Sequence, residues 1–208
     1  MSRYFPHTAY AEDQPLARTI LTTHVATRAV TVGTLLGVAA TSARTVIPAL
    51  RRPKIEQQQQ QQQQPFAARL LRSCAGSILA TLGVAGVGLV VRMWGRDDIE
   101  WRDRSWRLLE SKGQLETDDW TYGGMGAAAA TSALVMVKAK AKTGAGAGAG
   151  ARKKTPPPAV LVLGWRGLVG AAGLGSVGGM MGYLGWRYGV NGGKFPEKLP
   201  RKEERIGM

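Results

Sequence analysis

Cysteine, histidine and acidic residues are scarce in this chain of 208 residues. Its single cysteine, Cys74, excludes a disulfide within the chain and is expected to be a small packing residue of a helix. The two histidines, His7 and His24, lie far apart and have no metal-ligand spacing to Cys74. No glycine-rich phosphate loop follows a strand pattern, and no nucleophile is paired with a base. We therefore expect no metal, no cofactor and no intrinsic enzymatic activity.

The 14 acidic residues are outnumbered by 28 basic ones, which gives a formal net charge of +14. A nucleic-acid partner would require a clustered basic face with interleaved aromatic residues. Here the basic residues instead flank apolar segments. The charge therefore favours an anionic membrane surface and argues against nucleic acid.

Four apolar stretches rich in glycine, alanine and serine make up much of the chain. Glycine weakens a helix in water but lets helices approach closely in lipid, and the chain contains 28 glycines. We predict an all-α protein, a transmembrane bundle of four helices. The expected spans are residues 29–46, 73–91, 123–137 and 160–186.

Small residues three or four positions apart predict which helix faces pack together. Such ridges occur in the second, third and fourth stretches. The candidate helix-packing residues are Gly76, Ala80, Gly83, Gly124, Ala128, Ser132, Gly167, Ala171, Gly175 and Gly179.

Three arginines flank or enter the spans: Arg28, Arg44 and Arg166. Long basic side chains near helix ends usually reach outward to the membrane interface, and we expect this of all three. Two alternatives are that an arginine faces a buried carboxylate or that it lines an ion path.

Residues 92–122 form a polar, aromatic loop between the second and third spans. Within it, Asp97 and Asp98 can cap a helix that continues to about Glu110. Three interpretations are open: a helix lying in the membrane interface, a docking surface for a partner subunit, or a cap on the protein's own helices. The candidate partner contacts are Trp101, Arg102, Trp106, Arg107 and Trp120.

The expected organisation is an N-terminal tail with an amphipathic lead-in (1–28), a membrane domain (29–190) and a basic C-terminal tail (191–208). Two low-complexity connectors interrupt the domain: a polyglutamine connector at 51–66 and a glycine-alanine, lysine and proline linker at 138–158. Residues 44–72 carry six basic and one acidic residue, residues 138–154 carry six basic and no acidic residue, and in a four-span arrangement these two segments lie on one side. Their charge density favours the inside for them and the opposite side for both termini.

The four-span pattern resembles the channel subunits of the inner-membrane translocase family. A more specific resemblance lies in residues 100–110, the sequence EWRDRSWRLLE, followed by Lys112-Gly113-Gln114 and Asp118-Asp119-Trp120. This stretch is similar to the inter-helix loop of a fungal accessory membrane subunit of respiratory complex I. The resemblance covers most of residues 16–190, outside the two low-complexity segments.

The resemblance implies a non-catalytic accessory subunit of NADH:ubiquinone oxidoreductase that supports assembly or stability of its membrane arm. It implies a multi-pass protein of the mitochondrial inner membrane with both termini in the intermembrane space. The expected partners are other membrane subunits of the complex and phospholipid, including cardiolipin. The alternative is a component of an inner-membrane protein translocase or a small transport pore.

Overall fold

The computed structural model describes residues 4–47, 65–144 and 158–193, and every element in these ranges is helical. The all-helical prediction is therefore confirmed for the described residues. In chain order the elements are η1 (Ala11–Asp13), α1 (Ala17–Val46), α3 (Phe66–Met93), α4 (Asp98–Glu110), α5 (Lys112–Gly144), α6 (Ala159–Leu163), α7 (Trp165–Leu184) and the π-helix η3 (Gly185–Val190). Most of the two predicted connectors and of the C-terminal tail lies outside the described residues.

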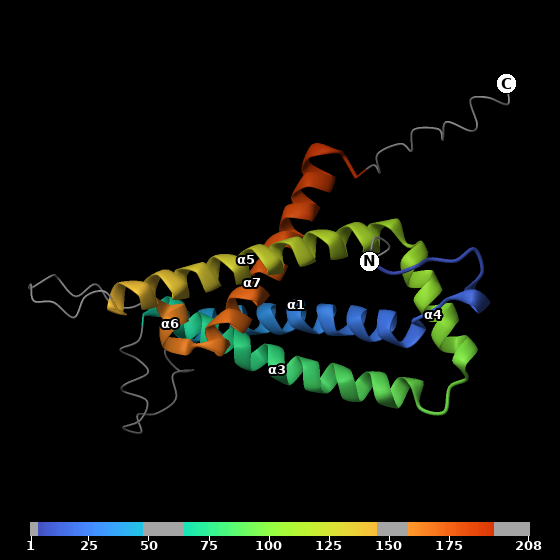
Figure 1. Cartoon of the computed structure of the whole chain (residues 1–208), viewed down its shortest axis with the longest axis horizontal. Coiled ribbons are helices and arrows are strands. Elements are labelled where there is room, and N and C mark those ends of the chain that lie inside the picture. The colour runs from blue at the N-terminus through green and yellow to red at the C-terminus, as the bar shows by residue number, and fades with distance from the viewer. Residues whose placement is uncertain (1–3, 48–64, 145–157, 194–208) are drawn as a thin grey trace, which may run out of the picture.

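Two antiparallel helix pairs form the molecule: α1 packs on α3, and α5 packs on α7. The pairs are joined because α7 also packs on α3 and α1. Figure 1 shows α7 crossing the other long helices at a steep angle, with α4 lying across one end. We call this the α4 end. The other end, where α6 lies, is the connector end.

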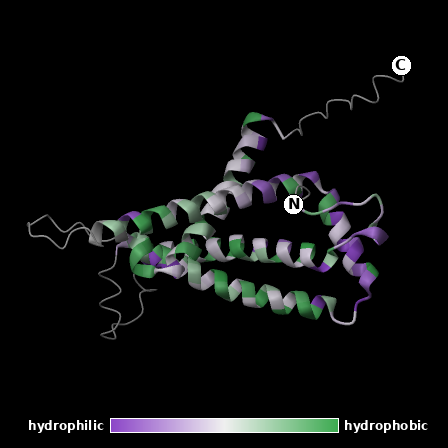
Figure 2. Ribbon diagram, in the orientation of Figure 1, coloured by the Kyte–Doolittle hydropathy of each residue, from purple (hydrophilic) through white to green (hydrophobic). Residues whose placement is uncertain are grey.

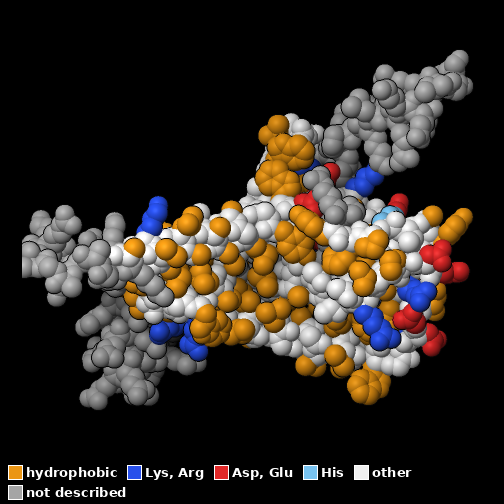
Figure 3. Space-filling view, viewed as in Figure 1, with side chains coloured by type: hydrophobic (Ala, Val, Ile, Leu, Met, Phe, Trp, Pro, Cys, Tyr) orange, Lys and Arg blue, Asp and Glu red, His pale blue; other side chains and the backbone are white. Residues whose placement is uncertain are grey.

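Three helices are long and apolar enough to cross a membrane: Ala17–Val46, Phe66–Met93 and Trp165–Val190. They fit a multi-pass membrane protein. Figure 2 shows the contrast between apolar α3 and hydrophilic α4, and in Figure 3 charged side chains gather toward the two ends of the face shown. The predicted third span, 123–137, lies within α5, which is not among the three. Its alanines and glycines present little apolar surface, so the four-span bundle is not confirmed.

Two sequence-based boundaries need correction. The polar loop predicted between the second and third spans is mostly helix, because α4 is followed after one residue by α5, which already begins at Lys112. The predicted helix ending near Glu110 is found as α4, although Asp97 makes no side-chain cap hydrogen bond. The predicted span 160–186 is broken at Gly164, whose φ of 56° and ψ of −131° suit only glycine.

The helices of each pair touch through glycines. In the α1–α3 pair, a Cβ added at Gly33 would lie 2.7 Å from Ile78 Cα, and one at Gly37 would lie 2.6 Å from Cys74 Cα. In the α5–α7 pair, a Cβ at Gly124 would collide with the carbonyl oxygen of Gly175. Side chains larger than hydrogen at these positions would push the helices apart.

Hydroxyl groups of α1 and α3 donate to backbone carbonyls of their own helix or of the partner helix. Thr34 donates to the carbonyl of Val30 at 2.8 Å, and Thr41 donates to that of Gly37 at the same distance. Across the pair, Thr81 donates to the carbonyl of Ala29 at 2.9 Å. Such bonds let polar side chains occupy an interface between membrane helices.

We predict that Gly124→Ala lowers the stability of the protein in detergent by about 1–3 kcal/mol, because the new methyl group overpacks the α5–α7 interface. The matched control is Gly126→Ala on the same helix, where no described residue outside the local helix backbone has a heavy atom within 4 Å of an added Cβ. The control should keep or slightly raise stability, since alanine favours helix. Thermal unfolding curves that shift equally for both variants would contradict the assigned interface.

Candidate functional site

The first three turns of α5 carry functional groups on two faces. Gln114, Asp118 and Tyr122 are spaced by four residues and therefore share the face that meets α1. Glu116 and Trp120 occupy a different face, which meets α7 and η3. Each face builds a separate candidate site near the α4 end.

The first site is a charge cluster in which the Asp118 carboxylate is fully buried between α5 and α1. Arg28 donates to Asp118 Oδ1 at 2.6 Å, and His24 Nδ1 lies 3.2 Å from Oδ2. With its amide oxygen turned toward Arg28, Gln114 accepts from Arg28 Nε at 3.0 Å and also from Nη2. These partners offset the desolvation of the buried carboxylate.

A second polar link lies one turn further along the same interface. Thr27 Oγ1 and the Tyr122 hydroxyl are 2.8 Å apart, and Thr27 also donates to the carbonyl of Thr23 at 2.8 Å. Here α1 and α5 are joined by long side chains, whereas α1–α3 and α5–α7 meet backbone to backbone. The cluster therefore fixes the position of α5 relative to α1.

This cluster corrects the expectation that Arg28 reaches outward as an interface anchor. The alternative, an arginine facing a buried carboxylate, describes what the structure contains. Arg44 and Arg166 differ, since both are exposed, and the Arg166 guanidinium lies 5.5 Å from the centroid of the Trp165 ring.

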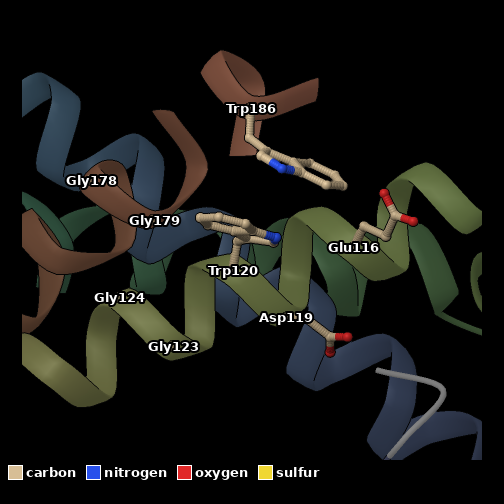
Figure 4. A pocket seen from close by; sticks show the side chains of 8 residues that line it. All are labelled: Glu116, Asp119, Trp120, Gly123, Gly124, Gly178, Gly179 and Trp186. Carbon is tan, nitrogen blue, oxygen red and sulfur yellow. The ribbon is translucent and has the colours of Figure 1, made fainter. Parts of the chain in front are cut away.

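The second site is an open cleft of about 610 Å³ between α5 and the α7–η3 segment. Four glycines from the two helices line it together with four larger residues, Glu116, Asp119, Trp120 and Trp186. The rings of Trp120 and Trp186 are stacked, with centroids 6.1 Å apart and an interplanar angle of 30°. Figure 4 shows Glu116 on the same side of α5 as the two indoles, while the Asp119 side chain points away from them.

The α4 residues proposed as partner contacts lie largely against the chain's own N-terminal segment. The Trp106 indole donates to the carbonyl of Thr8 at 3.0 Å, and the His7 ring stacks on it with centroids 5.9 Å apart. Arg102 donates to the carbonyl of Glu12, and the Arg18 guanidinium lies 5.6 Å from the Trp101 ring centroid.

These contacts support the interpretation of α4 as a cap on the protein's own helices. Arg107 is different, because its side chain is 73% exposed and, among the described residues, forms a local ion pair with Asp103 at 3.0 Å. Trp120 belongs to the cleft described above.

The predicted helix-packing residues fall into two groups. The structure brings Gly124, Ala128, Gly175 and Gly179 together at the α5–α7 contact, while Gly167 lies against Val160 of α6. Ser132 and Ala171 are buried in their helices.

The second group, on α3, makes no contact with another of the described helices. In the described part of the chain, no heavy atom lies within 4 Å of a Cβ added at Gly76 or Gly83, and Ala80 is exposed. The contacts of α3 with α1 and α7 instead run through the opposite face, which contains Leu71, Cys74 and Ile78.

Sequence reasoning missed several residues that carry contacts. Gly33 and Gly37 form a four-residue glycine pair on α1, a spacing that could have been recognised. Gly170 and Gly173 are close to Leu71 and Thr34 on the neighbouring helices. The sequence pattern does not single out Asp118, because it predicts a polar loop over residues 92–122, whereas Asp118 lies inside α5.

Comparison with known proteins finds no matching family, no matching curated protein and no matching solved structure. Within the described ranges, no group of three or more His, Cys, Asp or Glu side chains is placed to hold a metal ion.

We predict that Arg28→Met destabilises the protein by about 3–5 kcal/mol, because it leaves the Asp118 carboxylate buried without its main partner. The double variant Arg28→Met/Asp118→Leu should recover most of this loss, since an apolar pair needs no charge compensation. Equilibrium unfolding in detergent measures both values.

The matched control for this cycle is Arg107→Met, which removes an exposed ion pair and should leave stability nearly unchanged. A loss for Arg28→Met no larger than that for Arg107→Met would show that the cluster does not hold α1 to α5.

Proposed function

We propose that this chain is a non-catalytic accessory subunit of mitochondrial respiratory complex I, which supports assembly or stability of the membrane arm. The proposal rests on the resemblance of residues 100–120 and on one structural observation, the exposed face of α3. That face carries the small residues that the sequence marks for helix packing, yet the described residues leave them uncovered.

The exposed α3 face is defined by Gly76, Ala80, Gly83, Val87 and Val91. At about 100° per residue these positions fall on one side of the helix. Val87 is 65% exposed and Val91 is 71% exposed. A helix face with near-absent side chains gains little from lipid alone, whereas another helix could approach its backbone closely and gain many dispersion contacts.

The four-span arrangement is part of the same proposal. α5 is 33 residues long and packs along α7 through glycines, so its weakly apolar segment would be partly covered by protein. With α5 as a fourth span, the two basic connectors lie on the matrix side and both termini in the intermembrane space.

Lipid is the second expected partner. Arg69 and Arg72, near the start of α3, each have a buried Nε without a hydrogen-bond partner among the described residues. Basic groups at the connector end would attract anionic headgroups, and cardiolipin is the expected one in this membrane.

The alternative is a translocase component or small transport pore, and the charge cluster is the observation that favours it. Charged residues inside membrane helices often mark transport paths. The arrangement of His24, Arg28 and Asp118 argues for a structural role, because the buried carboxylate is bound by its neighbours and connects two helices.

Mass spectrometry of native membrane complexes separates the two functions. The accessory-subunit proposal predicts that the chain co-migrates with respiratory complex I and that its depletion lowers the amount of assembled membrane arm. Co-migration with a protein translocase, or voltage-dependent conductance of the purified chain in bilayers, would instead establish the alternative.

We further predict that Gly83→Leu reduces the fraction of the chain found in its complex by about fivefold or more, since a loss of 1 kcal/mol corresponds to that factor. The purified variant should be as stable as the wild type, because nothing in the described chain contacts Gly83.

The control is Gly88→Leu, which also points into open space but lies roughly 140° further around α3. This variant should associate normally. Equal loss in both variants, or in neither, would contradict docking through the exposed α3 face.

A further inference from the structure

The cleft between α5 and η3 combines the volume, the aromatic lining and the charge of a small-molecule site. Its volume of about 610 Å³ falls within the range of small-molecule sites, about 300–1,000 Å³. Its lining includes two indole rings, and the Glu116 carboxylate stands on their side of α5. Of its four lining glycines, Gly123 and Gly178 face open space, one from each helix (Figure 4).

The charge of the cleft is opposite to that of the chain. The larger lining residues include two carboxylates, Glu116 and Asp119, and no basic side chain, although the protein has a formal net charge of +14. Glu116 stands on the side of the indoles. A cation near this carboxylate and an indole face would gain both Coulomb attraction and a cation–π contact.

A positive group follows the cleft in the chain. Arg187 comes directly after Trp186. Its guanidinium donates to the Tyr183 hydroxyl and lies 5.6 Å from the Tyr188 ring centroid. The region therefore presents a negative charge beside the indoles and a positive charge next to it.

The cleft lies near the end of a candidate membrane span, Trp165–Val190. Tryptophan and tyrosine collect at the level of lipid headgroups, and Trp186 and Tyr188 are placed accordingly. The molecules that meet this level of the protein at high concentration are phospholipid headgroups.

We infer that this cleft binds the headgroup of a choline phospholipid. The quaternary ammonium would lie against the indoles of Trp120 and Trp186 beside the Glu116 carboxylate, and the phosphate would lie toward Arg187. The inference requires only that the chain is embedded in a membrane and is independent of the partner complex. The inference assigns a different lipid to each end of the molecule. The acidic cleft would repel anionic cardiolipin, which is expected at the connector end.

The test uses the full-length protein in maltoside micelles, titrated with phosphatidylcholine or cardiolipin and followed by native mass spectrometry. We expect Glu116→Gln to weaken phosphatidylcholine binding by roughly 3- to 10-fold and to leave cardiolipin binding unchanged. Trp186→Leu should have a similar effect, with Trp186→Phe between it and the wild type, since tryptophan is the best cation–π partner. Glu12→Gln, an exposed acidic residue outside the cleft, is the control.

Tetramethylammonium tests whether the cleft binds a phospholipid or only a free quaternary ammonium ion. Competition of this ion with phosphatidylcholine in the wild type, lost in Glu116→Gln, would support the assignment. Three results would overturn it: unchanged phosphatidylcholine binding in Glu116→Gln, equal weakening in Glu12→Gln, or binding of tetramethylammonium without binding of phosphatidylcholine.

Discussion

Backbone contact at glycine is the constraint on which this structure depends. At Gly124 the only side-chain atom is hydrogen, and the carbonyl of Gly175 fills the space that a Cβ would need. In a bilayer the hydrophobic effect does not drive helices together, so close packing must supply the attraction. α5 depends on this most, because its small side chains give it the weakest apolar surface of the long helices. Its position follows from fitting against α7.

The charge cluster acts in a different way from the glycine contacts. Dispersion between smooth helix faces changes little when one helix slides along another, whereas Asp118 has a single position that satisfies Arg28 and His24 together. Paired polar groups can therefore select one arrangement even when they add little net stability. The glycines bring the helices close, and the buried carboxylate sets the position of α5 against α1. The aromatic cleft follows from the same helix, because fixing α5 also places Trp120 under Trp186.

The sequence predicted features that depend on local pattern. The helix ending at Glu110 and the small-residue ridges that contain Gly124 and Gly175 both follow from spacing along one helix. Features that depend on two helices were not accessible in the same way. Spacing identifies a small-residue face but not which face meets which, so the pairing of Gly33 and Gly37 with α3 and the exposure of Gly76 and Gly83 could not be read from it. The burial of Asp118 depends on a second helix, α1, so its own segment could not reveal it, although Ser111 and Gln114 have the spacing of a helix start.

Alkaline carbonate extraction of native membranes tests the central claim most directly, because the contacts described here are those of helices packed in lipid. The extraction should be followed with an antibody to the chain, beside one peripheral and one multi-pass marker. The account predicts that the chain stays in the membrane pellet with the multi-pass marker. Release into the supernatant with the peripheral marker would contradict it.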